Sequence, residues 1–225
     1  PELEVRNVEM MENKVDSVLF DLDGTLWDAV PVIFHVIQDL FREYSSVPAA
    51  DTTLDDVYAY MGLQTWDIMK LCFPGAKDDT VRRIMDDYCS RLHPYLKRGG
   101  AVLYDGVEET LRTLSGQYRL FFVSNCDAEY LEGFWELFHL KSYFSGWICA
   151  GGTGRPKDEN IRIVQKQYGL QHPVYVGDTN KDREAAEKTQ VPFIHAAYGF
   201  GKDVPAVHRI SKITELPDYL QTSSI

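Results

Sequence analysis

The stretch Phe20-Asp21-Leu22-Asp23-Gly24-Thr25-Leu26 decides how the rest of the chain is interpreted. It follows a β-branched and apolar run over residues 15–20, which predicts a buried strand that ends in two carboxylates. Side chains alternate along a strand, so Asp21 and Asp23 are expected to point the same way. Ligands of open α/β sheets bind beyond the carboxyl ends of the strands, which is where this pair lies.

Two explanations fit this acidic pair. Like charges this close are unfavourable without a bound cation or a shared proton, which favours a functional site. Gly24 would then allow a sharp turn and leave its backbone amide open to an anion. The alternative is a strand that ends in an ordinary turn, because Asp and Gly both favour turns.

The composition is that of a soluble globular protein. The 225 residues can form one large domain or two unequal ones, and 44% of them are hydrophobic and 25% charged. The formal charge of −11 argues against nucleic acid or an anionic membrane as the main partner. It does not exclude a small anionic substrate, because a local cation can override the overall sign.

Location and assembly are inferred from what the sequence contains. The four cysteines are scattered without the paired spacing of a zinc site, which indicates reduced thiols and a cytoplasmic protein. No apolar stretch approaches the ~20 residues that a membrane span needs, and no leader pattern is present. Residues 1–14 carry no pattern and are interpreted as an extension. A monomer or a homodimer is expected.

The segment from residue 28 to residue 97 has a purely helical pattern. Asp28 is expected to cap a helix whose apolar stripe runs to Tyr44. Further helical patterns cover residues 54–60, 65–72 and 79–96, and a turn signal follows at 97–100. We therefore expect a helical insert over residues 28–97. Within it, Gln64, Trp66 and Lys70 could line the side that faces a substrate.

The remainder alternates between strands and helices. Apolar runs predict strands at 120–123, 147–150, 174–176 and 193–197, and amphipathic patterns predict helices at 106–115, 128–140, 159–168, 181–190 and 214–220. This alternation predicts an α/β fold with a Rossmann-like parallel sheet that is covered by helices on both faces. The core would comprise residues 15–27 and 98–225. The glycine-rich stretch 151–154 lacks the spacing of a phosphate loop and is interpreted as a flexible connection.

Polar residues follow four of the predicted strands and should meet at one edge of the sheet. They offer the groups that phosphoryl transfer through a carboxylate requires. One carboxylate can attack phosphorus, and a second can protonate the leaving oxygen. Mg²⁺ would offset the repulsion between the anions, and a hydroxyl and an amine could hold the phosphate oxygens. These residues are Asp21, Asp23, Ser124, Asn125, Arg155, Lys157, Asp178 and Asp182.

At these positions the chain resembles the haloacid dehalogenase-like hydrolases. Asp21-Leu-Asp-Gly-Thr-Leu resembles their first motif and Ser124-Asn125 the second. Lys157 is similar to the third, and Gly177-Asp178-Thr-Asn-Lys-Asp182 to the fourth. The helical insert is similar to the small cap domain of the phosphoglycolate phosphatase-like subgroup. The resemblance covers nearly the whole chain.

The resemblance implies a role for each matching residue. Asp21 would be the nucleophile and Asp23 the general acid and base. Mg²⁺ would be bound by Asp21, the backbone carbonyl of Asp23, and Asp178, with Asp182 as an acidic neighbour that binds directly or through water. The groups that would hold the phosphate are Gly24, Ser124, Asn125 and Lys157.

The cation of the third motif is open between two residues. Many relatives have Lys directly before Pro, whereas this chain has Arg155-Pro156 and then Lys157. Counting back from the helix end at Gly169 favours Arg155. The chemistry favours Lys157, whose compact charge can contact a nucleophile and a phosphate together.

The predicted activity is a Mg²⁺-dependent phosphatase that hydrolyses a small phosphate monoester, such as phosphoglycolate, a sugar phosphate or a nucleotide, through an aspartyl-phosphate. A sugar phosphomutase is the nearest alternative, although such family members usually have an apolar residue at the position of Thr25. A dehalogenase would give Asp23 no acid–base duty. A non-catalytic phosphate-binding regulatory module would not need both Asp21 and Asp23.

Overall fold

The computed structural model describes residues 15–223 and 225. A six-stranded sheet in the order β5-β4-β1-β6-β7-β8 lies at the centre of the core, and every neighbouring pair in it is parallel. The expected Rossmann-like α/β fold is thus confirmed; residues 1–14, interpreted as an extension, lie outside the described residues. The strands are β1 (Ser17–Phe20), β4 (Arg119–Ser124), β5 (Gly146–Cys149), β6 (Pro173–Gly177), β7 (Phe193–Ala196) and β8 (His208–Ile210).

The central position of β1 brings the predicted strand ends together. Phe20 lies opposite Phe122 of β4 on one side and Val176 of β6 on the other. The chain therefore leaves β1 between the ends of its two neighbours, and Asp21 follows directly. Strand β8 was not predicted, because its three residues include two polar ones and form no apolar run.

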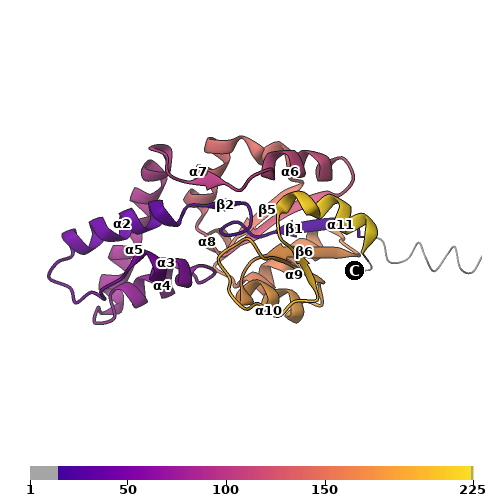
Figure 1. The fold of residues 1–225 in the computed structure, drawn as a ribbon. Coiled ribbons are helices and arrows are strands. Elements are labelled where there is room, and N and C mark those ends of the chain that lie inside the picture. The colour runs from indigo at the N-terminus through magenta and orange to yellow at the C-terminus, as the bar shows by residue number, and fades with distance from the viewer. Residues whose placement is uncertain (1–14, 224) are drawn as a thin grey trace, which may run out of the picture.

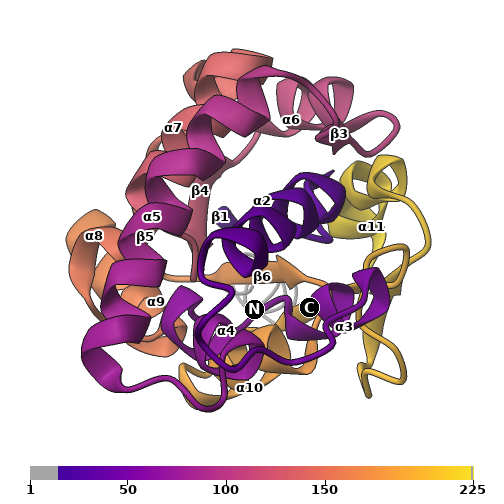
Figure 2. The same ribbon diagram turned by 90° about the vertical axis from the view of Figure 1, so that its left-hand side faces the viewer.

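Helices cover both faces of the sheet, and alternation along the strands assigns the side chains to them (Figures 1 and 2). Val18 and Phe20 pack in a cluster with α6, α7 and α11, whereas Leu19 packs in a separate cluster with α9 and α10. The helices are α6 (Val107–Ser115), α7 (Ala128–Phe138), α9 (Lys157–Tyr168), α10 (Asn180–Lys188) and α11 (Leu216–Thr222), with the 3₁₀ turns η1 (Leu140–Tyr143) and η2 (Ile213–Glu215).

Four further helices lie together beyond the carboxyl end of β1 (Figure 1). Their apolar sides pack on one another and continue the core cluster that includes Val18 and Phe20. Thr53 begins α3 with a capping box, in which its hydroxyl accepts from the amide of Asp56 and its amide donates to the Asp56 carboxylate. The four are α2 (Val30–Glu43), α3 (Leu54–Tyr60), α4 (Thr65–Cys72) and α5 (Asp78–Lys97).

Two short segments differ from the predicted pattern. The chain enters and leaves the helical segment through an antiparallel ribbon of β2 (Trp27–Asp28) and β3 (Val102–Leu103), so Asp28 ends a strand and Ala29 is the N-cap of α2. Asp28 still contacts the start of the helix, because its Oδ1 accepts from the Val30 amide at 2.9 Å. The stretch 151–154 is not simply a flexible connection, because most of it forms the helical turn α8 (Ala150–Thr153). Residue 151 has to be a glycine, because an added Cβ would lie only 2.6 Å from the Cα of Asp127.

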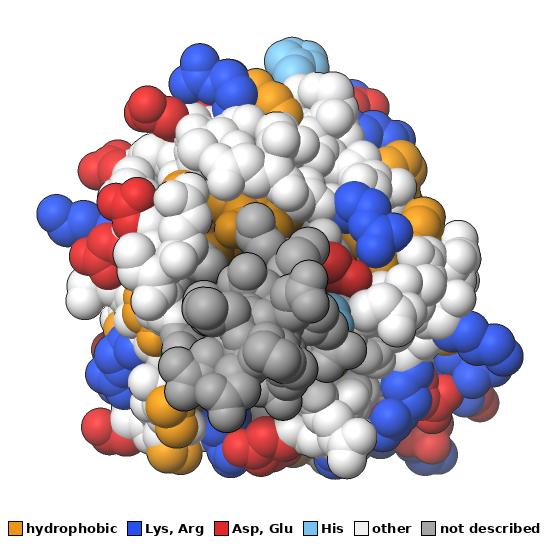
Figure 3. All heavy atoms as spheres, turned by 90° about the vertical axis from the view of Figure 1, so that its right-hand side faces the viewer, with side chains coloured by type: hydrophobic (Ala, Val, Ile, Leu, Met, Phe, Trp, Pro, Cys, Tyr) orange, Lys and Arg blue, Asp and Glu red, His pale blue; other side chains and the backbone are white. Residues whose placement is uncertain are grey.

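The surface opposite the four helices carries charges of both signs. Figure 3 shows Lys and Arg side chains spread among Asp and Glu side chains there, and the described part of this face has no continuous basic area. The expectation that nucleic acid is not a partner stays a prediction. Among the described residues, no helix has both the length and the apolar character that crossing a membrane requires.

Candidate active site

The turn after β1 places two carboxylates at the edge of the sheet. The amide of Asp21 donates to the Val176 carbonyl at 2.9 Å, which extends the β1–β6 pairing by one residue. The amides of Thr25 and Leu26 then both donate to the carbonyl of Leu22, which closes a tight turn. Asp21 and Asp23 both line one cavity between the sheet edge and the helices α2–α5. The two carboxylates therefore face the same space, as alternation along the strand predicted.

Gly24 is required by this turn for two reasons. Its φ is 77°, in the region that favours glycine, and an added Cβ would lie 2.1 Å from Oδ2 of Asp178. The close approach lets the first and fourth motifs share one site. A side chain at residue 24 would push Asp178 away.

We expect Gly24→Ala to lower the free energy of unfolding by about 2 kcal/mol or more, since backbone strain and a clash with a buried carboxylate add up. Gly154→Ala is the matched control, because Gly154 has a similar φ of 65° but no atom within 4 Å of an added Cβ. Urea unfolding of both variants measures the difference. Equal losses would show that contact with Asp178 adds nothing.

Lys157 lies between two carboxylates. Its Nζ is 2.8 Å from Oδ1 of Asp21 and 2.5 Å from Oδ1 of Asp182, and all three side chains are buried. Burial favours the neutral amine, but Asp182 and Asp21 outweigh it and hold the pKa of Lys157 well above its usual range. Arg155 is instead exposed and pairs with Glu159 at 2.7 Å. The structure thus brings Lys157, and not Arg155, to Asp21.

Asp21 itself is a buried carboxylate with neighbours of both signs. Burial and repulsion from Asp182 raise its pKa to about 6, although Lys157 acts in the opposite direction. A bound cation would favour the ionised form that nucleophilic attack requires.

Asp178, Asp182 and Asp21 form an acidic cluster in which one oxygen of each lies within 4.8 Å of the others. Asp182 is engaged by Lys157 and by Thr179, which donates from its amide at 2.9 Å and its hydroxyl at 2.6 Å. Oδ2 of Asp178 accepts from the amide of Phe200 at 2.7 Å, but its buried Oδ1 has no partner. Burial, Asp182 and Asp21 raise the pKa of Asp178 well above its usual range.

This cluster fits a hard divalent cation. An unpartnered buried carboxylate oxygen beside a second, strongly desolvated carboxylate is an unfavourable arrangement unless a positive charge lies between them. Mg²⁺ is commonly held by one or two carboxylates together with water and phosphate oxygens. Asp21 and Asp178 offer that set, whereas the oxygens of Asp182 are already hydrogen-bonded.

Asp23 has a different environment from Asp21. Its Oδ1 accepts from the hydroxyl of Tyr130 at 2.5 Å and from Nε1 of Trp27 at 2.9 Å. Burial raises the pKa of Asp23 to about 7, so the group can hold or release a proton near neutral pH. No motif in the sequence predicts the roles of Tyr130 and Trp27. The only local signal was the spacing of Trp27, four residues after Asp23.

The ends of β4 and β6 complete the cavity and its support. Ser124 and Asn125 line the cavity, and Nδ2 of Asn125 donates to the Gly62 carbonyl at 2.9 Å, across to the helical segment. Gly24 lies beside the site as expected. On the side of Asp178 that faces β7, Nε2 of His195 lies 3.1 Å from the Asp178 backbone carbonyl. No spacing in the sequence indicated this contact.

The helical segment closes the cavity mainly with apolar side chains. Gln64, Trp66 and Lys70, which could have faced a substrate, do not line it. Lys70 instead pairs with Asp78 at 2.5 Å and lies 5.5 Å from the ring centre of Trp66, because α4 presents its other side to the core. The lining residues of this segment are Ile33, Met61, Gly62, Leu63, Thr65, Ile68, Tyr88 and Leu92.

The fold and this arrangement define a Rossmann-like α/β core with an acidic site at the carboxyl edge of a parallel sheet. The model of the haloacid dehalogenase-like hydrolase family matches residues 18–196. The chain therefore belongs to that family.

Individual relatives agree with this assignment. A phosphoglycolate phosphatase of Rhodobacter capsulatus is 26% identical over 83% of this chain and 86% of its own length. One of Aliivibrio fischeri is 27% identical over 87% and 89%. A haloacid dehalogenase-like hydrolase of Streptococcus pneumoniae has the same fold, with a TM-score of 0.77, 22% identity, and coverage of 92% of this chain and 99% of its own. The family match and these relatives confirm the expected class, a haloacid dehalogenase-like phosphatase.

Proposed function

We propose that this enzyme is a Mg²⁺-dependent phosphatase that hydrolyses a small phosphate monoester through an aspartyl-phosphate on Asp21. The observation that carries the proposal is the unequal environment of the two carboxylates. Asp21 contacts Lys157, whereas Asp23 is held by the neutral donors Tyr130 and Trp27, and both carboxylates line the same cavity. One is thus suited to attack and the other to carry a proton.

In the first step, an oxygen of Asp21 attacks phosphorus and the bond from phosphorus to the leaving oxygen breaks. Protonated Asp23 donates its proton to that oxygen, so the alcohol leaves neutral. In the second step, Asp23 accepts a proton from water as the water oxygen attacks phosphorus. The bond from phosphorus to the Asp21 oxygen breaks, so inorganic phosphate is released and the Asp21 carboxylate is restored. The hydrogen bonds from Tyr130 and Trp27 hold Asp23 in place during both steps.

The remaining residues bind the phosphoryl group. Lys157 offsets the charge of Asp21 and can contact a phosphate oxygen, while the Ser124 hydroxyl, Asn125 and the Gly24 amide supply further donors. Mg²⁺ would be held by Asp21, the Asp23 carbonyl and Asp178, with Asp182 fixing Lys157 beside them. When bound, it would neutralise the repulsion between the carboxylates and the phosphate.

We also propose that residues 28–97 act as a cap that selects the leaving group, with the core in residues 15–27 and 98–225. Support comes from the lining of the cavity, where the core supplies the carboxylates and the helical segment faces them. Phosphoglycolate, which appears in the names of the relatives, is one possible substrate; sugar phosphates and nucleotides are others. The four cysteines are free, as the proposed cytoplasmic location requires.

Hydrolysis of phenyl phosphate with and without Mg²⁺ tests the proposal. We expect release of inorganic phosphate that depends on Mg²⁺ and is lost on chelation with EDTA. A phosphomutase would interconvert sugar phosphates and release little phosphate. Full activity in EDTA would contradict the proposed role of the metal.

Mg²⁺ binding should also be visible as pH-dependent stability. The folded-state pKa values of Asp21 and Asp23, about 6 and about 7, lie above the ordinary value of 3.8. The folded metal-free protein therefore binds more protons than the unfolded chain between pH 4 and pH 7, and these two groups make it less stable as the pH rises through this range. Asp178 acts in the same direction.

We expect Mg²⁺ to raise the melting temperature more at pH 7.5 than at pH 5, because only ionised carboxylates bind it. At a concentration 100 times its Kd, the rise at pH 7.5 should be about 5–10 °C. Differential scanning fluorimetry measures it, with Asp178→Asn as the variant that should lose most of the effect. A larger rise at pH 5 than at pH 7.5 would contradict this assignment of the metal ligands.

A further inference from the structure

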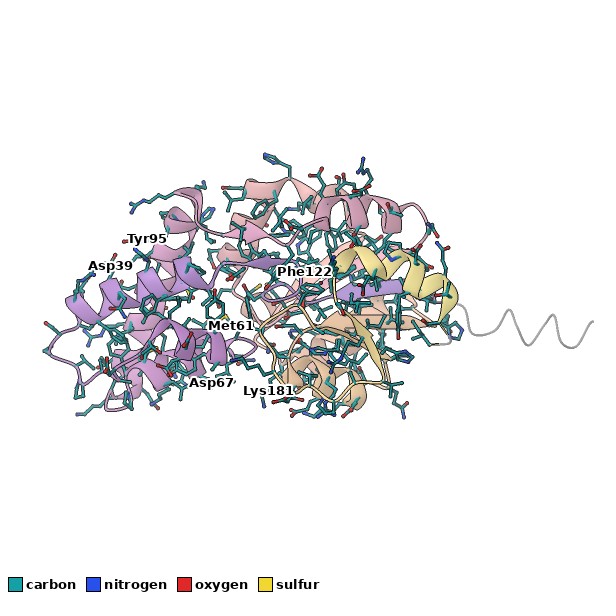
Figure 4. All side chains as sticks on the ribbon, in the orientation of Figure 1. Asp39, Met61, Asp67, Tyr95, Phe122 and Lys181 are labelled. Atoms are coloured by element: carbon teal, nitrogen blue, oxygen red, sulfur yellow. The ribbon has the colours of Figure 1, made fainter. Side chains whose placement is uncertain are left out.

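The part of the cavity that faces a leaving group is formed mainly by apolar and neutral side chains, with one carboxylate among them. Ile33, Met61, Ile68 and Leu92 contribute apolar surface and are all at least nine-tenths buried. The buried ring of Tyr88 lines the same space, and burial raises the pKa of its hydroxyl well above the usual range, so it stays neutral. Met61 lies where the helical segment meets the core (Figure 4).

Positive charge is confined to the other end of the cavity. Among the described lining residues, Lys157 is the only Lys or Arg, and it is already bound to Asp21 and Asp182. Three basic residues of the helical segment pair with carboxylates outside the cavity. Lys70 binds Asp78, Arg91 binds Glu43, and Lys97 binds Glu136 at 2.7 Å.

A carboxylate faces the leaving-group side instead. Asp127 lines the cavity, and its Oδ2 accepts from the hydroxyl of Thr65 at 2.5 Å and from Sγ of Cys89 at 3.5 Å. These neutral donors hold the side chain towards the helical segment without cancelling its charge. Asp127 is the residue before α7, but its side chain makes no capping hydrogen bond to that helix. The carboxylate is therefore available for the contact with Thr65 and Cys89.

The free space is small. The volume open to the centres of water molecules is about 40 Å³, which corresponds to a few waters at most. A bulky sugar or base would have to displace the lining residues. An anionic group would enter a partly desolvated site beside Asp127 with no free cation, which is strongly unfavourable.

We propose that this cavity selects phosphate esters whose leaving group is small and carries no negative charge. This inference rests on the proposed function and narrows its substrate class. Phosphoglycolate is then a poor substrate, because its leaving group, glycolate, carries a carboxylate. It also assigns Asp127 as a residue that determines specificity by repelling anionic leaving groups.

Three phosphate esters of nearly equal size test the proposal: 2-phosphoglycolate, 2-hydroxyethyl phosphate and 2-aminoethyl phosphate. With Mg²⁺ and the full chain, we expect kcat/KM for the hydroxyethyl ester to exceed that for phosphoglycolate about tenfold or more. The aminoethyl ester should be at least as good a substrate as phosphoglycolate. A kcat/KM for phosphoglycolate equal to or above that of the hydroxyethyl ester would overturn the proposal.

Variants assign the effect to Asp127. Asp127→Asn should raise the ratio of kcat/KM for phosphoglycolate over the hydroxyethyl ester about tenfold. Ile68→Lys is a second variant for the case that Asp127→Asn does not fold. It adds a cation to the cavity and should therefore also raise this ratio. Asp67→Asn is the matched control, because Asp67 is exposed on α4 and does not line the cavity, and it should leave the ratio unchanged (Figure 4). If Asp127→Asn folds and this ratio is unchanged, Asp127 does not determine the specificity.

Other outcomes separate this inference from the proposed function. If neither phenyl phosphate nor any of the three small esters is hydrolysed, the phosphatase proposal fails and the inference with it. If phenyl phosphate is hydrolysed but none of the three esters is, the claim of a small leaving group is wrong. A neighbouring hollow that shares Met61 and Leu63 contains Lys181 and Lys202. Loss of phosphoglycolate hydrolysis in Lys181→Ala or Lys202→Ala would show that anionic groups bind there instead.

Discussion

Asp21→Asn is expected to lower kcat for phenyl phosphate by at least ~10³-fold, because loss of a covalent nucleophile removes the central step of the reaction. The amide of Asn has nearly the same shape as the carboxylate but cannot form the acyl phosphate. The substitution should not lower stability in the absence of metal, since burial and Asp182 already disfavour the charge of Asp21. Activity loss with an unchanged melting temperature would separate chemistry from folding.

Steady-state kinetics with phenyl phosphate, together with thermal unfolding, measures this effect. Asp67→Asn makes the same chemical change at an exposed residue and should retain full activity. Binding of inorganic phosphate to Asp21→Asn, followed by calorimetry, checks that the site still forms. If Asp21→Asn turned over at the wild-type rate, Asp21 could not be the nucleophile.

Lys157→Met is expected to have the largest effect on stability. Its amine is the only described cation between Asp21 and Asp182, and its removal leaves those buried carboxylates uncompensated. Breaking a buried ion pair in this way costs about 3–5 kcal/mol. We therefore expect a loss of that size in metal-free protein near pH 7, and a fall in kcat/KM of ~10²-fold or more from the lost phosphate contact.

Arg155→Met is the matched control for Lys157→Met. Arg155 is exposed and pairs with Glu159 one helical turn away, an arrangement worth about 0.3–0.5 kcal/mol. Urea unfolding and phenyl phosphate kinetics of both variants decide between the two cations that the sequence left open. A larger activity loss in Arg155→Met than in Lys157→Met would contradict the position of Lys157 in the structure.

The sequence predicted the sheet and the meeting of its strand ends because these depend on local patterns. The run before Asp21 and the run 120–123 are apolar enough to identify buried strands without other information. Parallel order then follows from their alternation with helices, and it brings Asp21, Ser124 and Asp178 to one edge. The same logic failed at β2, β3 and β8, which are only two or three residues long, and β2 and β8 also include polar residues.

The contacts that divide the roles of the two carboxylates could not be predicted in the same way. Tyr130 reaches Asp23 across 107 positions of the sequence, and Asn125 reaches Gly62 across 63. Neither contact leaves a periodic pattern, because each depends on how α7 and the helical segment pack. The choice between Lys157 and Arg155 also needed the structure. Pro156 lies directly before α9, and the residues on either side of it differ in burial: Lys157 is buried and Arg155 is exposed.

The aspartyl-phosphate on Asp21 is the central claim, and trapping it is the most direct test. A single turnover with Mg²⁺ and phenyl phosphate can be quenched in acid, reduced with borohydride, digested and analysed by mass spectrometry. We expect residue 21 to be converted to homoserine, and we expect no such product in Asp21→Asn or in unreacted enzyme. Complete turnover with residue 21 unmodified, or homoserine at residue 23 instead, would contradict it.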